Sequence, residues 1–161
     1  MKKRILVALD GSMASLRVVA HAGNIIGGCE GFQITLCHVF EVPTVPPIYK
    51  KYLERGGEPC QVLGRGYKDS LQVDRVRVEE AIFIPAKQIL EQKGVVDVQT
   101  KLRWDTTGDI AQEIIQETKA GKYDAVALGR RGHSMVMAYV LGSVTSKVVH
   151  HIGDSAVWVV E

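Results

Sequence analysis

One strand-to-helix connection near the C-terminus constrains the fold more than any other feature of this sequence. Residues 123–128 form a mostly apolar run that is typical of a buried strand, and the amphipathic residues 145–152 are typical of a helix. Between them stands the pattern glycine-x2-glycine-x9-glycine-serine, whose members are Gly129, Gly132, Gly142 and Ser143. Because glycine permits a positive φ and close approach of a ligand to the backbone, the pattern predicts a binding loop.

The start of that helix predicts an anion site. If Ser143 is the N-cap, the N–H groups of Val144 and Thr145 lack intrahelical partners and lie at the positive end of the helix dipole. The hydroxyls of Ser143 and Thr145 add two further polar groups. Phosphate is the anion that such a cradle favours. The alternative is two surface turns that merely require glycine and serine, and the joint spacing favours the phosphate site.

Strand patterns alternate with helix patterns along the whole chain. We expect strands over residues 4–9, 33–40, 96–102, 123–128 and 156–160, and helices over 12–26, 71–93, 110–120 and 143–151. The predicted fold class is therefore α/β, with a mostly parallel sheet in an open, doubly wound arrangement. A length of 161 residues with 46% hydrophobic residues predicts a single domain.

Two segments depart from this alternation. Residues 41–70 contain Gly56, Gly57 and four of the five prolines without any period, so we expect a long irregular insertion that acts as a lid or as a partner-binding segment. Pro85 falls inside the predicted helix 71–93, where it removes a backbone donor and crowds Ala81. A kink or break near residues 83–86 is the expected consequence.

The chain resembles the universal stress protein family. The resemblance rests on the spaced glycines, on the opening strand and acidic turn from Val7 to Ser12, and on His38-Val39 at the end of the second strand. It covers essentially residues 1–161 and implies one Rossmann-like nucleotide-binding domain. Its five-stranded, mostly parallel sheet has the order 3-2-1-4-5 and helices on both faces. Where the family often has Cys-Pro, this chain has Ser155-Ala156, which leaves the geometry at the start of the last strand open.

The resemblance also implies an ATP site. Glycines of the motif are expected against the ribose and phosphate, namely Gly129 and Gly132. The β- and γ-phosphates are expected on Gly142, Ser143, Val144 and Thr145. The apolar wall and backbone partners for adenine are expected to be Ala8, Leu9, Val39 and Leu128.

Charged residues beside the cradle have two readings each. Asp10 follows the first strand. One role for it is to hold Mg²⁺ or Mn²⁺ and contact the nucleotide, and the alternative is to close an Asx turn. These roles are compatible, so Asp10 belongs to the predicted site. Arg131 and Arg130 bring two guanidinium groups, which bind phosphate bidentately. The alternative for both arginines is solvated positions on a loop.

Several other functions are disfavoured. A net charge of +2 does not indicate nucleic-acid binding, and no apolar run reaches the roughly 20 residues of a membrane span. Lys2, Lys3 and Arg4 precede only a short apolar stretch, so we expect a cytoplasmic protein without a signal peptide. We interpret the three cysteines as thiols without a catalytic role, His133 as a bystander, and His150-His151 as complements of a helix dipole.

The sequence therefore predicts a cytoplasmic, regulatory ATP-binding protein of the stress response, with slow or no hydrolysis. One alternative is an ATP-hydrolysing or adenylyl-transfer enzyme that uses Asp10, Arg131 and His133; the other is a nucleotide-independent interaction module that works through residues 41–70. The last strand, residues 156–160, is apolar on both faces. An uncovered edge of that kind predicts a homodimer that pairs these strands.

Overall fold

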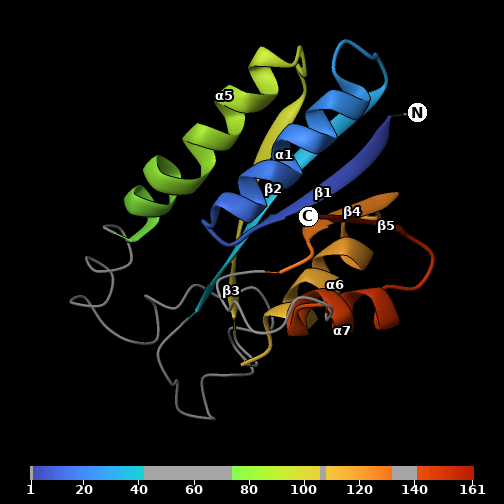
Figure 1. Cartoon of the computed structure of the whole chain (residues 1–161). Helices are drawn as coiled ribbons and strands as arrows, with labels where there is room; N and C mark the ends of the chain where they lie inside the picture. The colour runs from blue at the N-terminus through green and yellow to red at the C-terminus, as the bar shows by residue number, and fades with distance from the viewer. Residues whose placement is uncertain (1, 42–73, 106–107, 132–140) are drawn as a thin grey trace.

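The computed structural model describes residues 2–41, 74–105, 108–131 and 141–161. Five parallel strands form one sheet in the order β3-β2-β1-β4-β5, as predicted (Figure 1). The strands are β1 (Lys3–Leu9), β2 (Phe32–Glu41), β3 (Val98–Asp105), β4 (Ala125–Gly129) and β5 (Ala156–Val160). The helical elements are α1 (Met13–Ile26), the π-helical turn η1 (Glu79–Phe83), α5 (Ile84–Gln92), α6 (Ile110–Ala120) and α7 (Ser143–His151).

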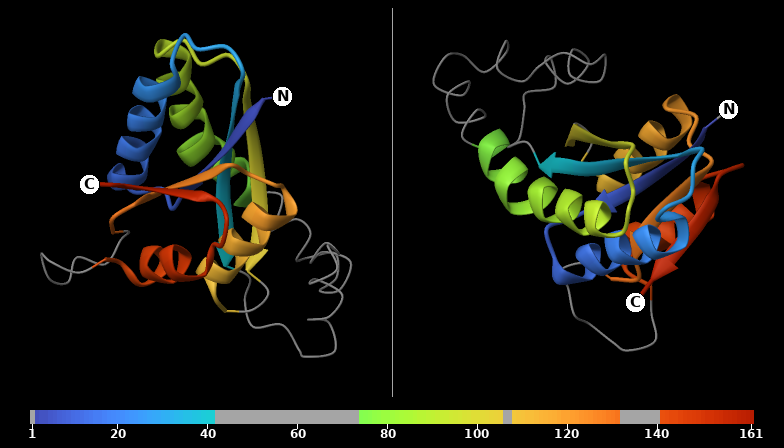
Figure 2. Two further views of the ribbon diagram at one scale, coloured as in Figure 1. Left: turned by 90° about the vertical axis from the view of Figure 1, so that its right-hand side faces the viewer. Right: turned by 90° about the horizontal axis from the view of Figure 1, so that it is seen from above.

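Helices cover both faces of this sheet (Figure 2). One apolar cluster joins α1 and α5 to residues such as Val7 and Leu36, and a second joins α6 and α7 to Leu6 and Val126. Leu6 and Val7 are neighbours on β1 that point to opposite faces, as the period of two requires. The central strands are therefore buried from both sides, which explains their nearly continuous apolar sequence.

Helix α1 begins where the sequence predicts but is buried over a wider surface. A serine at the start of the predicted helix is a typical N-cap, and the Ser12 hydroxyl does accept a hydrogen bond from the Ser15 N–H at 3.2 Å. The three-four spacing of apolar residues places Leu16 and Ala20 on the predicted buried face, but both are only half-buried, whereas Val18 and Ala22 are fully buried. The helix packs against both the sheet and α5, so its buried surface exceeds the single stripe that the period predicts.

Pro85 widens one helical turn instead of breaking the helix. Residues 74–92 are helical throughout, and η1 occupies the five residues immediately before Ile84. The Ile84 N–H bonds to the Glu79 carbonyl, five residues earlier. Proline has no N–H to donate and occupies the first turn of α5, where the donor is not needed. The predicted irregularity is therefore present as a π-turn.

The third and fourth strands begin two residues later than predicted. Val96 is 95% exposed and lies before β3, which forms the edge of the sheet. Before β4, the Tyr123 N–H bonds to the Thr118 carbonyl and thereby closes the end of α6. The Tyr123 N–H is thus hydrogen-bonded to α6 and not to a neighbouring strand, although the Tyr123 side chain is buried with the strand residues.

Ser155 and Ala156 define the start of β5. The Ser155 hydroxyl donates to the Tyr123 carbonyl at 2.8 Å, and the Ala156 N–H donates to the Asp124 carbonyl at 2.9 Å. A proline at position 156 has no N–H for the second of these bonds. The departure from the family pattern thus introduces one additional backbone hydrogen bond between β4 and β5.

The predicted insertion at residues 41–70 lies outside the described residues except for Glu41, which ends β2. Gly132, His133 and Cys60 also lie outside them. Within the described ranges, no helix is both long enough and apolar enough to cross a lipid bilayer.

The ends of α1 and α5 meet at Gly27, and this close approach predicts a difference between adjacent glycines. A Cβ built on Gly27 overlaps the carbonyl oxygen of Lys93, whereas one built on Gly28 meets no heavy atom within 4 Å. We expect Gly27→Ala to lower the free energy of unfolding by about 3 kcal/mol, because backbone atoms must move. Gly28→Ala should cost about 1 kcal/mol, since only its positive φ of 72° is unfavourable. Urea unfolding measures both, and equal losses contradict the prediction.

Candidate functional site

The predicted site residues converge on a single cavity of about 670 Å³. It lies at the carboxyl ends of β1, β2 and β4 and reaches the first turns of α6 and α7. This is where parallel α/β sheets with a reversal of strand order leave a crevice. Every predicted residue in the described part of the chain lines it: Ala8, Leu9, Asp10, Val39, Leu128, Gly129, Arg131, Gly142, Ser143, Val144 and Thr145.

Helix α7 is capped one residue earlier than predicted. Gly142 is the N-cap, and Ser143 is the first helical residue without a capping side-chain bond. The Gly142 N–H donates to the Arg130 carbonyl at 2.9 Å, and the Gly142 carbonyl accepts from the Ser146 N–H at 2.8 Å. The prediction of Ser143 as the cap is wrong, because the backbone of Gly142 is held against the end of β4. The N–H groups of Ser143, Val144 and Thr145 are then the donors that the helix leaves unused.

Thr145 is part of the support of this site. Thr145 is 4% exposed, and its hydroxyl donates a hydrogen bond to the Gly129 carbonyl at 2.8 Å. That bond fixes the first turn of α7 to the last residue of β4. The sequence predicted two available hydroxyls beside the cradle, but the Thr145 proton is committed to Gly129. Ser143 therefore carries the remaining hydroxyl of the pair.

Asp10 closes a tight turn at the end of β1. Its Oδ1 accepts hydrogen bonds from the Ser12 N–H at 2.9 Å and from the Ser12 hydroxyl at 2.6 Å. This is the Asx turn that the sequence allowed, and the residue still lines the cavity. No group of three potential metal ligands exists among the described residues, so their side chains do not form a complete cation site.

The two arginines of the loop separate. Arg130 forms an ion pair with Glu161, and its N–H donates to the Val160 carbonyl at the end of β5. The sequence favoured Arg131 over Arg130 as the site residue, and Arg131 is the one that lines the cavity. Gly129 keeps the loop compact, since a Cβ there lies 3.1 Å from the Arg131 carbonyl oxygen.

An ion pair links the helices on the far wall. Lys147 on α7 contacts Asp109, the N-cap of α6, with 2.9 Å between Nζ and Oδ2. The hydrogen bond from Lys147 lowers the pKa of the Asp109 carboxyl. Both side chains are partly exposed, so the pair contributes little free energy while linking α7 to the start of α6.

Seven further residues line the cavity that the sequence prediction did not include: Ser15, Cys37, His38, Phe40, Glu41, Ile110 and Ile114. The strand period provided a signal for two of them, because Cys37 and Glu41 share a face with Val39. Ile110 and Ile114 are four residues apart on α6 and face the same way. The His38 Nδ1 lies 2.8 Å from the Leu9 carbonyl oxygen, so this nitrogen carries the proton.

Comparisons with known proteins identify the family and agree with the fold. Residues 1–160 match the profile of the Universal stress protein family. Universal stress protein Sll1388 of Synechocystis sp. is 29% identical over 151 residues, covering 92% of each chain. A universal stress protein in complex with cAMP has a TM-score of 0.62 at 20% identity, covering 99% of this chain and 96% of that chain. An Arabidopsis thaliana family member with AMP bound has a TM-score of 0.61 at 17% identity, covering 98% and 90%.

Cys37 is unsuited to nucleophilic chemistry, and this predicts a labelling pattern. Burial, followed by the nearby Glu117 charge, raises the pKa of its thiol from 9.0 to about 12. With a maleimide near neutral pH, we expect Cys29, which is exposed, to react and Cys37 to remain unmodified until urea is added. Peptide mass spectrometry reads the two sites. The folded state favours the neutral thiol of Cys37. This raised pKa therefore leaves the free energy of unfolding unchanged below pH 9 and lowers it as the pH rises from 9 toward 12. Rapid modification of Cys37 in the folded protein contradicts this assignment.

Proposed function

This chain belongs to the universal stress protein family, and we propose that it binds ATP in the cavity at the carboxyl ends of β1 and β4. We propose further that it acts in the cytoplasm as a regulatory protein of the stress response. The observation that carries the proposal is the meeting of an apolar wall with the N-terminus of α7 in one cavity. Its volume is in the range typical of small-molecule sites.

The two halves of the cavity suit the two halves of the nucleotide. Ala8, Val39 and Leu128 provide apolar surface for the adenine ring. The family members that contain AMP and cAMP support an adenine nucleotide as the ligand class. Those two ligands have one phosphate each, so the preference for ATP rests on the cradle at Ser143–Thr145 together with Arg131. Gly132, which the family resemblance implies beside the ribose and phosphate, belongs to the same proposal.

We propose that a divalent cation, Mg²⁺ or Mn²⁺, accompanies the nucleotide. Asp10 is the residue that would hold it, and phosphate oxygens would complete the coordination. The observation in favour is a carboxylate fixed by its Asx turn at the rim of the cavity. The cation would neutralise phosphate charge and add affinity for the longer phosphate chain.

Slow hydrolysis follows from where the acidic residues lie. Among the described residues that line the cavity, only Asp10 and Glu41 are acidic. Asp10 is held in its turn, and Glu41 ends β2, which β1 separates from the glycine end of β4. Glu41 therefore lies away from the α7 cradle, and the Asp10 carboxylate, engaged in its turn and with the proposed cation, would not serve as a base on a γ-phosphate.

The enzymatic alternative relies on Asp10, Arg131 and His133. Incubation with ATP and Mn²⁺, followed by chromatography of ADP and AMP, separates it from the regulatory proposal. Turnover above roughly 1 per second supports an enzyme, since that is an ordinary catalytic rate. The interaction-module alternative, working through residues 41–70, would gain support from a complete absence of nucleotide binding.

The charge at the first position of α7 provides a test of ATP binding. We expect Ser143→Asp to weaken ATP binding by about tenfold or more, because the carboxylate repels the β- and γ-phosphates. The same carboxylate stabilises the helix N-terminus, so the protein should remain folded. AMP, with its shorter phosphate chain, should lose less affinity. Isothermal titration calorimetry with Mg²⁺ measures both ligands.

Met13→Asp is the matched control for this charge. Met13 is the first residue of α1 and is 72% exposed. We expect its variant to bind ATP as the wild type does. If the wild type binds neither ATP nor AMP, or if both variants lose affinity equally, the proposed site is wrong.

We propose that the edge strand β5 forms the interface of a homodimer. β5 is the last strand of the sheet, and Val159 is 40% exposed on it. We expect a dimer by light scattering at roughly tens of micromolar protein, and a monomer for Val159→Lys because two charges would meet across the two-fold axis. Val149→Lys, at an α7 residue of 39% exposure, is the control and should remain dimeric. A monomeric wild type removes the proposal.

A further inference from the structure

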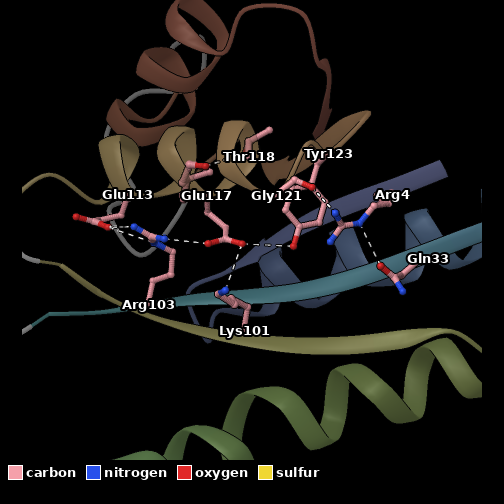
Figure 3. A network of polar contacts seen from close by, with 10 residues as sticks. Arg4, Gln33, Lys101, Arg103, Glu113, Glu117, Thr118, Gly121 and Tyr123 are labelled. Atoms are coloured by element: carbon pink, nitrogen blue, oxygen red, sulfur yellow. Dashed lines mark hydrogen bonds and ion pairs between the residues drawn. The ribbon is translucent and has the colours of Figure 1, made fainter. Parts of the chain in front are cut away.

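We propose that a second cavity, between the β2–β3 edge of the sheet and α6, binds a small oxyanion such as a phosphate or carboxylate group. This cavity of about 330 Å³ is separate from the proposed nucleotide site. Its cationic lining residues are Arg4, Lys101 and Arg103, and Glu117 is the acidic one. Figure 3 shows these side chains in a row between the sheet and α6, with Tyr123 between Glu117 and Arg4.

The cavity exists because α6 covers the edge strand incompletely. Leu102 on β3 packs toward the cluster under α1 and α5, so the alternate residues Gln99, Lys101 and Arg103 point to the α6 side. All three line the cavity. Within the described chain, α6 is the element that contacts β3 from this side, and its carboxylates reach toward the strand. The result is a polar groove beside an apolar core.

Arg103 is fully engaged with two buried carboxylates. Its guanidinium contacts Glu113 at 2.7 Å and Glu117 at 2.9 Å, and these glutamates are 2% and 4% exposed. Burial by itself lowers the pKa of Arg103, but the hydrogen bonds and charges of the two glutamates raise it above its usual value. This triad organises one end of the groove and leaves no charge of Arg103 for a ligand.

The other two cations are less well compensated. Among the described residues, Lys101 pairs only with Glu117, at 3.7 Å. Arg4 donates to neutral acceptors, the Gln33 Oε1 at 3.2 Å and the Gly121 carbonyl, and its guanidinium stacks 4.7 Å from the centroid of the Tyr123 ring. Three cations against the two glutamates leave one excess positive charge along the groove. That excess lies on the Arg4 and Lys101 side.

A buried hydroxyl points to the same place. Thr35 is 2% exposed and lines the cavity, and its Oγ1 has no hydrogen-bond partner among the described residues. Burial raises the pKa of the Tyr123 phenol, and the Thr35 hydroxyl lies near enough to oppose this in part, yet no hydrogen bond of normal geometry joins them. A buried polar atom without a partner is rare in native proteins, and an acceptor oxygen supplied by a ligand would satisfy it.

These groups together select the ligand class. The Arg4 guanidinium, the Lys101 ammonium and the Thr35 hydroxyl are all hydrogen-bond donors on one groove. Oxyanions accept several such bonds at once and compensate the excess charge, which strengthens each bond. An apolar or cationic ligand satisfies none of these donors.

The test follows anion binding by ¹H–¹⁵N NMR in the Ser143→Asp protein, in which the cradle of the nucleotide site is blocked. Inorganic phosphate and succinate are titrated separately, at an ionic strength held constant with chloride. We expect one of them to produce saturable shifts of the amide signals of Thr35, Lys101 and Arg4. Absence of saturable shifts with both anions, or shifts confined to residues 143–145, overturns the proposal.

Two variants distinguish a ligand role from a structural one. Lys101→Met and Thr35→Val should each weaken binding by about tenfold, the usual effect of losing a hydrogen bond to a charged group. Thr35→Val should at the same time leave the thermal midpoint unchanged or raise it, since it removes an unsatisfied hydroxyl. Lys119→Met, which removes an exposed charge on α6 outside the groove, is the control and should bind normally. If Lys119→Met and Lys101→Met lose the same affinity for the anion, the loss reflects only the lower net positive charge of the protein, and the proposed site is wrong. The outcome is independent of ATP binding.

Discussion

The reversal of strand order at β1 is the constraint on which the rest of the structure depends. β1 has β2 on one side and β4 on the other, and every pairing is parallel. The connections β1–β2 and β2–β3 run in one direction across the sheet, and β3–β4 and β4–β5 run in the other. Because right-handed crossovers place the helices of opposite directions on opposite faces, α1 and α5 cover one face and α6 and α7 the other. The connections after β1 and β4 leave in opposite directions, which opens the crevice where Asp10 and Gly129 meet.

The two faces of the sheet are covered by different kinds of contact. Beneath α1 and α5 the contacts are apolar, from Ile5 to Leu90. Beneath α6 the apolar contacts give way to the triad of Arg103, Glu113 and Glu117 toward the edge strand. Two buried carboxylates are tolerated because one guanidinium binds both, and removing it would leave them uncompensated. The triad therefore joins α6 to β3 directly.

Short-range signals in the sequence were sufficient for most of the local structure. The Ser12 cap, the glycine that ends α1 and the period of the buried strands each depend on residues within four positions of one another. Eleven of the residues proposed for the site line one cavity. Those at the glycine pattern and Asp10 were proposed from local sequence, whereas Ala8, Leu9, Val39 and Leu128 came from the resemblance to the family. The order of the strands came from the resemblance to the family, and the structure confirms it.

What the tertiary structure alone decided involves partners far apart in the chain. The Arg130 side chain pairs with Glu161, which is 31 positions away in the sequence. The Arg4 side chain bonds to the Gly121 carbonyl, which is 117 positions away. Gly142 displaces Ser143 as the cap because its N–H reaches the Arg130 carbonyl. Glu113 and Glu117 have the spacing of a solvated helix face, and only the position of Arg103 buries them. By itself, the sequence determined the order of helices and strands along the chain, the Ser12 cap and the polar groups at the strand ends. Which of those groups face one another depends on the free energy of long-range packing, which no local window contains.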